Sequence, residues 1–153
     1  MNGIDTDAEV NPGTYVNIER RWQKGDVVSL DMPMDIKLIE GHPFIEEVRN
    51  EAAIKRGPVV YCIESVDLPE ETEILDVYLP VNAKLTPEYR PELLGGVTTI
   101  TGNVLLRNES EKDLYHEITK PEWRSVTATF VPYYAWSNRG QGEMTVFMPV
   151  VWE

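Results

Sequence analysis

The segment from Pro132 to Met144 carries the side chains of this sequence that are best suited to bind a ligand. It brings three aromatic rings together with an amide and a guanidinium group, on Tyr133, Tyr134, Trp136, Asn138 and Arg139. Sugar-binding sites combine flat aromatic faces with a few placed polar groups, because a sugar ring has apolar faces and hydroxyl edges. One interpretation of this loop is therefore a carbohydrate contact.

A structural role is the interpretation favoured when the loop is considered without a partner. Its aromatic side chains would cap the core or contact another domain, and Arg139 would stack on them or bond nearby carbonyl groups. Gly140 and Gly142 would allow a turn with positive φ. The two interpretations stay open at the level of the sequence.

No catalytic residue is assigned from the sequence. Cys62 with His42 or His116 would form a nucleophile and a base on paper, but Cys62 lies in the most apolar run of the chain. A free cysteine in such a run is usually a small hydrophobic core residue. The two histidines and the single cysteine lack the spacing of a zinc site, so no metal ligand is assigned either.

The composition is that of a soluble globular protein with an acidic surface. Hydrophobic residues make up 42% of the 153 residues and charged residues 26%, with a net charge of −12. This charge disfavours nucleic acid as a partner, because phosphate binding needs a basic surface. No apolar run reaches the about 18 residues of a membrane span, so no membrane partner is expected either.

Apolar residues mostly alternate with polar ones at a period of two, which predicts β-strands and little or no helix. Alternation from Val16 to Trp22 and from Val28 to Met32, around Lys24–Gly25–Asp26, predicts a hairpin. Two further predicted strands start at Ile36 and Leu75. Four more cover residues 59–63, 97–101, 125–130 and 144–148. This count of eight or more strands favours an all-β fold, an antiparallel β-sandwich.

Three stretches depart from simple alternation. Residues 45–56 have helical spacing, but Gly57 and Pro58 follow closely, so a turn at Arg49–Asn50 leading into a strand is preferred. Residues 85–94, with Pro87 and Pro91, are predicted to be an irregular crossover. The charged residues 107–123 are predicted to be a loop.

Several segments of the sequence resemble the C-terminal part of β-L-arabinofuranosidase-like glycoside hydrolases, a bacterial family long described as a domain of unknown function, and they occur in the same order as in that family. They are Tyr15–Trp22 with Lys24–Asp26, Arg56–Glu64, Leu93–Val97 and Pro132–Met144. The enzymes of this family have an (α/α)6 catalytic barrel followed by β-sandwich domains, so the resemblance implies such an architecture for the parent protein. Glutamate and cysteine residues of that barrel hold zinc and cleave the sugar in such enzymes. No matching barrel segment is found in this sequence, and Cys62 matches a sandwich cysteine.

The resemblance therefore implies a noncatalytic accessory domain of a glycoside hydrolase. Residues 1–33 would be a hairpin segment of a preceding β-sandwich, and residues 34–153 the accessory β-sandwich itself. The expected partners are the catalytic barrel of the parent chain, a second copy of the chain through the hairpin, and a plant-type carbohydrate. No cofactor is expected in this chain, whereas the parent's catalytic domain would bind zinc. The expected compartment is the bacterial cytoplasm or periplasm.

Overall fold

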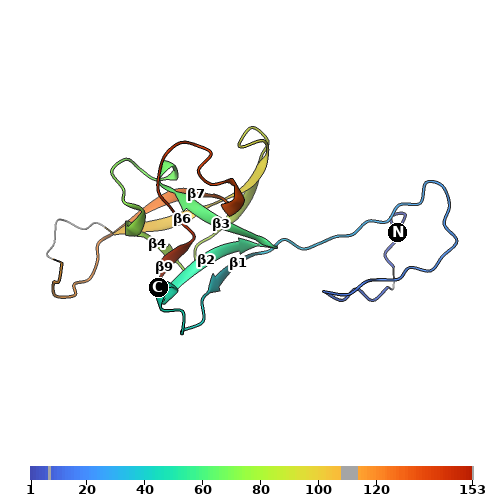
Figure 1. The fold of residues 1–153 in the computed structure, drawn as a ribbon, viewed down its shortest axis with the longest axis horizontal. Helices are drawn as coiled ribbons and strands as arrows, with labels where there is room; N and C mark the ends of the chain where they lie inside the picture. The colour runs from blue at the N-terminus through green and yellow to red at the C-terminus, as the bar shows by residue number, and fades with distance from the viewer. Residues whose placement is uncertain (7, 108–113, 153) are drawn as a thin grey trace. The chain divides into compact units, whose positions relative to one another are not determined.

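The computed structural model describes residues 1–6, 8–107 and 114–152, and their regular structure is all-β (Figure 1). Four short 3-10 turns accompany the strands, η1 (Glu46–Val48), η2 (Ser65–Asp67), η3 (Ile74–Asp76) and η4 (Tyr133–Ala135). The nine strands are β1 (Ile36–Glu40), β2 (Glu51–Arg56), β3 (Val59–Glu64), β4 (Val77–Pro80), β5 (Thr86–Arg90), β6 (Val97–Arg107), β7 (Trp123–Pro132), β8 (Met144–Thr145) and β9 (Phe147–Val151). Within the described ranges no helix is long and apolar enough to cross a membrane.

Six of these strands close into a barrel, in the cyclic order β2, β9, β4, β6, β7, β3 and back to β2. Strands β1, β5 and β8 pair at the sides of β2, β6 and β3. All described pairs are antiparallel except β4 with β9, which is parallel. The all-β class predicted from the alternation is confirmed, whereas the two facing sheets of a sandwich are replaced by a closed barrel.

The barrel closes because several strands change partners along their length. Strand β3 pairs with β2 through Val59 and Val60, with β7 through Tyr61 and Cys62, and with β8 through its last two residues. Such changes of partner turn a sheet around a corner. Alternation in the sequence says which face of a strand is buried but not which strands are neighbours, so it could not distinguish a barrel from a sandwich.

The barrel interior holds the hydrophobic core. Its largest completely enclosed side chains come from different strands and include Ile54, Tyr61, Leu79, Phe130 and Met148. The Tyr61 hydroxyl donates a hydrogen bond to the carbonyl of Thr98 at 3.0 Å, which satisfies the polar end of this buried ring. Burial of these side chains is the main stabilisation of the barrel.

Most predicted elements in residues 34–152 are confirmed, including the turn before β2. Asn50 adopts a left-handed conformation with φ 63°, and β2 starts at the next residue. The irregular crossover predicted for residues 85–94 is wrong, because β5 forms there and pairs with β6. Pro87 is compatible with this strand because an edge strand has one side without a ladder. Part of the predicted loop 107–123 lies outside the described residues, and residues 114–122 contain no strand or helix.

Residues 1–33 form a compact unit separate from residues 34–153. The predicted turn is present, because the amide of Asp26 donates to the carbonyl of Gln23 at 3.1 Å. The predicted strands are wrong, since no described residue before Ile36 is in a strand. A two-stranded hairpin is marginal without a surface on which to bury one face. Trp22 and Leu30 on its apolar face are exposed instead.

Candidate functional site

A pocket of about 770 Å³ opens at one end of the barrel. The strand register explains its position. Leu38 is opposite Ile54, and Ala52 is opposite Met148, so Leu38 and Ala52 face the barrel interior. Val150 follows Met148 at a spacing of two and shares this face. These side chains form an apolar floor where β1, β2 and β9 meet the end of the core.

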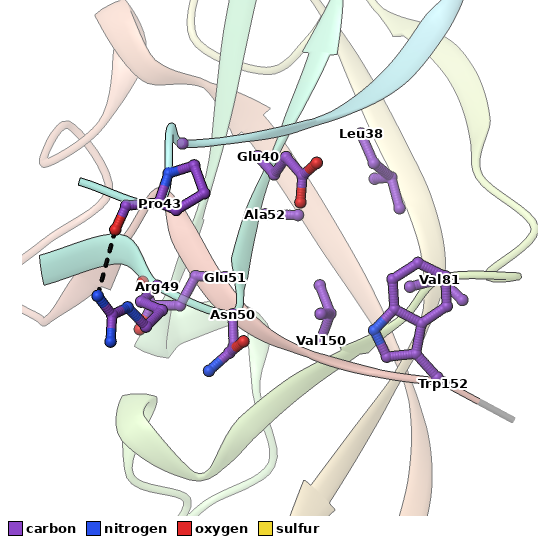
Figure 2. Close-up of a pocket in the computed structure, with 11 residues that line it drawn as sticks. Leu38, Glu40, Pro43, Arg49, Asn50, Glu51, Ala52, Val81, Val150 and Trp152 are labelled. Atoms are coloured by element: carbon purple, nitrogen blue, oxygen red, sulfur yellow. Dashed lines mark hydrogen bonds between the residues drawn. The ribbon is translucent and has the colours of Figure 1, made fainter. Parts of the chain in front are cut away.

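Polar and aromatic side chains surround this floor (Figure 2). Trp152 lies on one side of the opening and Arg49 on the other, with Glu40 between them in the view of Figure 2. Trp152 is 78% exposed as a residue, so its indole is accessible to a ligand. The remaining polar groups at the rim come from Asn50 and Glu51.

Local backbone structure holds the polar rim. The Arg49 guanidinium donates to the carbonyl of Pro43 at 3.3 Å, and the carbonyl of Asn50 accepts the amide of Val150 at 3.0 Å. Asparagine is one of the few residues that enters the left-handed region readily. Partial burial raises the pKa of the Glu51 carboxyl group, because desolvation disfavours the charged form.

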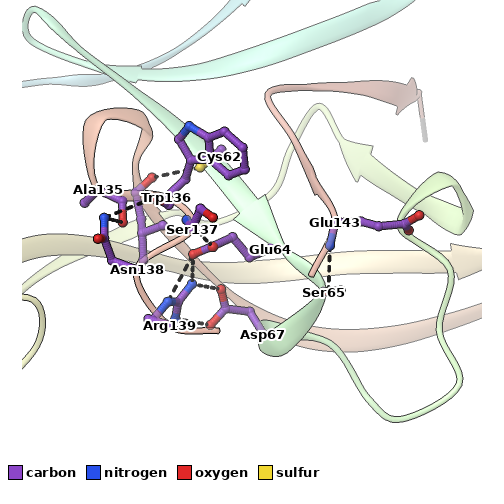
Figure 3. A network of polar contacts seen from close by, with 11 residues as sticks. Cys62, Glu64, Ser65, Asp67, Ala135, Trp136, Ser137, Asn138, Arg139 and Glu143 are labelled. Carbon is purple, nitrogen blue, oxygen red and sulfur yellow. Dashed lines mark hydrogen bonds and ion pairs between the residues drawn. The ribbon is translucent and has the colours of Figure 1, made fainter. Parts of the chain in front are cut away.

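The loop singled out from the sequence is anchored to β3 by a buried ion-pair network (Figure 3). The Arg139 guanidinium bonds Glu64 at the end of β3, with its Nε 3.0 Å from Oε2, and Asp67 in η2, with an Nη 2.8 Å from Oδ1. The side chains of Glu64 and Asp67 are 7% and 9% exposed. The bonds to Asp67 and Glu64 raise the pKa of Arg139, which therefore carries its charge permanently.

Further hydrogen bonds hold the rest of the loop in place. The amide of Ser137 donates to Oε1 of Glu64 at 2.9 Å, and the Asn138 side chain donates to the carbonyls of Ala135 and Trp136. The amide of Glu143 donates to the hydroxyl of Ser65 at 3.1 Å. The polar groups predicted to contact a sugar are thus engaged within the loop or with the barrel.

The aromatic side chains of the loop remain exposed. Tyr133, Tyr134 and Trp136 all keep a substantial accessible surface, Tyr134 the most at 71%. The structure therefore places the five predicted contact residues in one loop but separates their roles. Arg139 neither stacks on the rings nor bonds a carbonyl in the network described, because the buried carboxylates of Glu64 and Asp67 require its charge.

Cys62 lies in the core. Its thiol is completely buried, donates to the carbonyl of Val131 at 3.7 Å, and has a pKa raised to about 11, chiefly by burial. A thiolate is the reactive form of cysteine, so this environment favours a structural role. His42 and His116 are exposed in loops. Within the described residues there is no group of three or more histidine, cysteine or acidic side chains that could hold a metal ion.

The sequence analysis missed the barrel-mouth pocket and the partners of Arg139. Glu64 carried a signal, because a charged residue directly after the apolar run 59–63 needs a buried counter-charge. The pocket carried none, since Leu38, Asn50 and Trp152 are far apart in the sequence and meet only through the barrel topology.

The fold and the site together define a closed all-β domain with a braced aromatic loop and an open barrel mouth. Residues 36–149 match the family model of the glycoside hydrolase family 127 C-terminal domain. The chain belongs to this family.

Similar proteins agree with this assignment. The non-reducing end β-L-arabinofuranosidase of Bifidobacterium longum subsp. longum is 32% identical in an alignment of 126 residues, and the match covers 78% of this chain and 19% of that protein. The crystal structure of a family 127 β-L-arabinofuranosidase from Geobacillus stearothermophilus T6 is 39% identical with a TM-score of 0.70, and the match covers 78% of this chain and 19% of that one.

Two further solved structures match nearly the whole chain. One, described as a glycoside hydrolase, is 39% identical with a TM-score of 0.87, and the match covers 98% of this chain and 25% of that one. The other, a family 127 β-arabinofuranosidase, is 33% identical with a TM-score of 0.80, at 98% and 22% coverage. Residues 1–33 therefore have counterparts in these structures. The chain spans about a fifth to a quarter of the length of these relatives.

Proposed function

We propose that this chain is a noncatalytic domain of a larger glycoside hydrolase of the β-L-arabinofuranosidase type, and that it supports the catalytic barrel of its parent chain or joins two copies of it. The observation that carries the proposal is the match of residues 36–149 to a C-terminal domain, within relatives of which this chain spans only about a fifth to a quarter. The parent's sugar cleavage, and the zinc expected with it, would then depend on residues outside this chain.

The size of the native protein tests this proposal most directly. An antibody against residues 34–153 would be used on extracts of the source cells. A band several-fold larger than the 17.5 kDa of this sequence is expected. A band near 17.5 kDa would mean that the domain acts alone, which contradicts the proposed role. Size fractionation of the same extract should place arabinofuranosidase activity in the fractions that contain the band.

Self-association through residues 1–33 is the second part of the proposal. Trp22, Val28, Leu30 and Met32 are exposed in this unit, although their alternation suits one buried face of a strand pair. Unpaired strand-like segments recruit partners. Sedimentation of the complete chain and of residues 34–153 should show an oligomer only for the former. Equal association of both chains would refute a role for this segment.

A carbohydrate-binding role for the aromatic loop is the second candidate. The exposed rings of Tyr133, Tyr134 and Trp136 support it, because aromatic faces can pack on sugars without the engaged polar groups of the loop. The chain should then be retained on an arabinose-rich plant polysaccharide, and Trp136→Ala should abolish the retention. Retention that survives this substitution would exclude the loop as the binding site.

A further inference from the structure

The barrel-mouth pocket, defined above by its floor of Leu38, Ala52 and Val150 and its rim with Trp152, has the composition of a small-molecule site. Its volume of about 770 Å³ falls within the about 300–1,000 Å³ typical of such sites. Mouths of β-barrels are among the places where ligand sites recur, because the strand ends leave the core open there. All lining residues belong to residues 34–152, so the pocket is complete within the barrel unit.

We propose that this pocket binds a neutral saccharide of one or two rings, with one ring against the indole of Trp152. The exposed indole offers a flat apolar surface, and the floor continues this apolar contact. Glu40, which lies two residues after Leu38 on the same face of β1, supplies carboxyl oxygens, and Asn50 an amide, for the hydroxyl groups of the saccharide.

The charges at the rim argue for a neutral ligand. Two carboxyl side chains, Glu40 and Glu51, and one guanidinium, Arg49, line the opening, in a chain whose net charge is −12. An anionic ligand would be repelled by this balance. A long apolar ligand would remove water from the two carboxyl groups without offering them a hydrogen bond. A polyhydroxylated ring satisfies both the polar rim and the apolar floor.

The position of Trp152 makes the proposal testable without loss of the fold. It follows the last residue of β9, and its side chain is largely exposed, so replacing it removes little core packing. Tyr115 is the control, because it is also an exposed aromatic residue but belongs neither to the pocket nor to the aromatic loop. Trp136→Ala is a separate variant that tests the aromatic loop as the alternative site.

The experiment is a titration of the complete isotope-labelled chain with L-arabinose, D-glucose and glycerol, followed by nuclear magnetic resonance. The choice of L-arabinose rests on the proposed function, whereas D-glucose tests the pocket without it. Each ligand is taken to about 100 mM, because one ring is expected to bind with roughly millimolar affinity. A saturable shift of the Trp152 indole signal and of the amide signals of Ala52 and Val150 is expected for at least one sugar.

The variants decide where the sugar binds. Trp152→Ala should weaken binding at least about tenfold, Glu40→Gln should weaken it severalfold, and the control Tyr115→Ala should leave it unchanged. The proposal is overturned if neither sugar gives a saturable shift, if glycerol gives the same shifts, or if the shifts follow Trp136. Such a result would leave the immunoblot test of the proposed function unaffected, since the size of the native protein does not depend on this pocket.

Discussion

Replacing Arg139 by methionine should strongly destabilise the barrel, because the guanidinium neutralises two buried carboxylates. Glu64 and Asp67 have side chains less than a tenth exposed, and both accept hydrogen bonds from Arg139. Removing one partner of a buried ion pair typically costs about 3–5 kcal/mol, since the other charge is left uncompensated. A loss of about 4 kcal/mol is a large part of the about 5–15 kcal/mol that stabilises a typical domain.

Urea unfolding of the wild type and of Arg139→Met would measure this loss. At a typical slope of about 2 kcal/mol per molar urea, the unfolding midpoint should fall by about 2 M. Arg124→Met is the control, because this arginine is exposed on β7 and should change the free energy of unfolding by less than about 0.5 kcal/mol. A triple variant with Glu64→Gln, Asp67→Asn and Arg139→Met should recover part of the loss, since it leaves no unpaired charge.

The reasoning would be refuted if Arg139→Met and Arg124→Met had the same small effect. It would also fail if neutralising the two carboxylates in the Arg139→Met background lowered the stability further. The first result would make the network a surface contact without energetic consequence, as many exposed ion pairs are. The second would mean that the two carboxylates stabilise the fold through contacts other than the one with Arg139.

Three further predictions concern the barrel. The pKa of Cys62 is about 11 in the folded chain against a reference value of 9.0, so the unfolded chain loses the thiol proton first and the free energy of unfolding should fall by up to about 3 kcal/mol between about pH 9 and 11. Cys62→Ala should remove this pH dependence, and an equal decrease of the unfolding free energy with pH in both chains would contradict the prediction. Asn50→Gly should change the unfolding free energy little, whereas Asn50→Val should cost about 1–3 kcal/mol at φ 63°; equal unfolding midpoints would show that the left-handed backbone is unimportant. Gly102→Ala should lower the free energy of unfolding by about 1–3 kcal/mol, because the new Cβ would lie 2.5 Å from a methyl group of Leu85. In thermal unfolding, Leu85→Ala should destabilise the Gly102→Ala chain less than it destabilises the wild type, and strictly additive losses would refute the clash.

The strands of the barrel could be predicted from the sequence because half of their residues are buried. Val97–Thr101 and Val126–Phe130 are β-branched or alternate strictly, and both form strands that extend beyond these ranges. The hairpin predicted in residues 16–32 shows the limit of this reasoning. Apart from Arg20 its apolar residues alternate, yet no strand forms there, because alternation predicts a strand only where a partner surface exists to bury the apolar face.

The candidate site could be predicted only where it is local in sequence. The aromatic loop is one continuous segment, so its residues were found, although the engagement of Arg139 with Glu64 and Asp67 depends on contacts more than 70 positions apart. The barrel mouth combines residues 38–52 with Val81, Val150 and Trp152. Its assembly requires the pairing of β9 with both β2 and β4, which no local pattern specifies.

The pairing of β9 with β2 and β4 also has a consequence for biosynthesis. The neighbours of β9 in the barrel, β2 and β4, are synthesised well before it, and each has an unpaired edge until residues 147–151 have been synthesised. Contacts this distant in sequence carry a large loop-closure cost, so barrel closure should be a late and slow step. A nascent chain that lacks β9 would therefore expose two ladder edges, which are prone to pair with other chains.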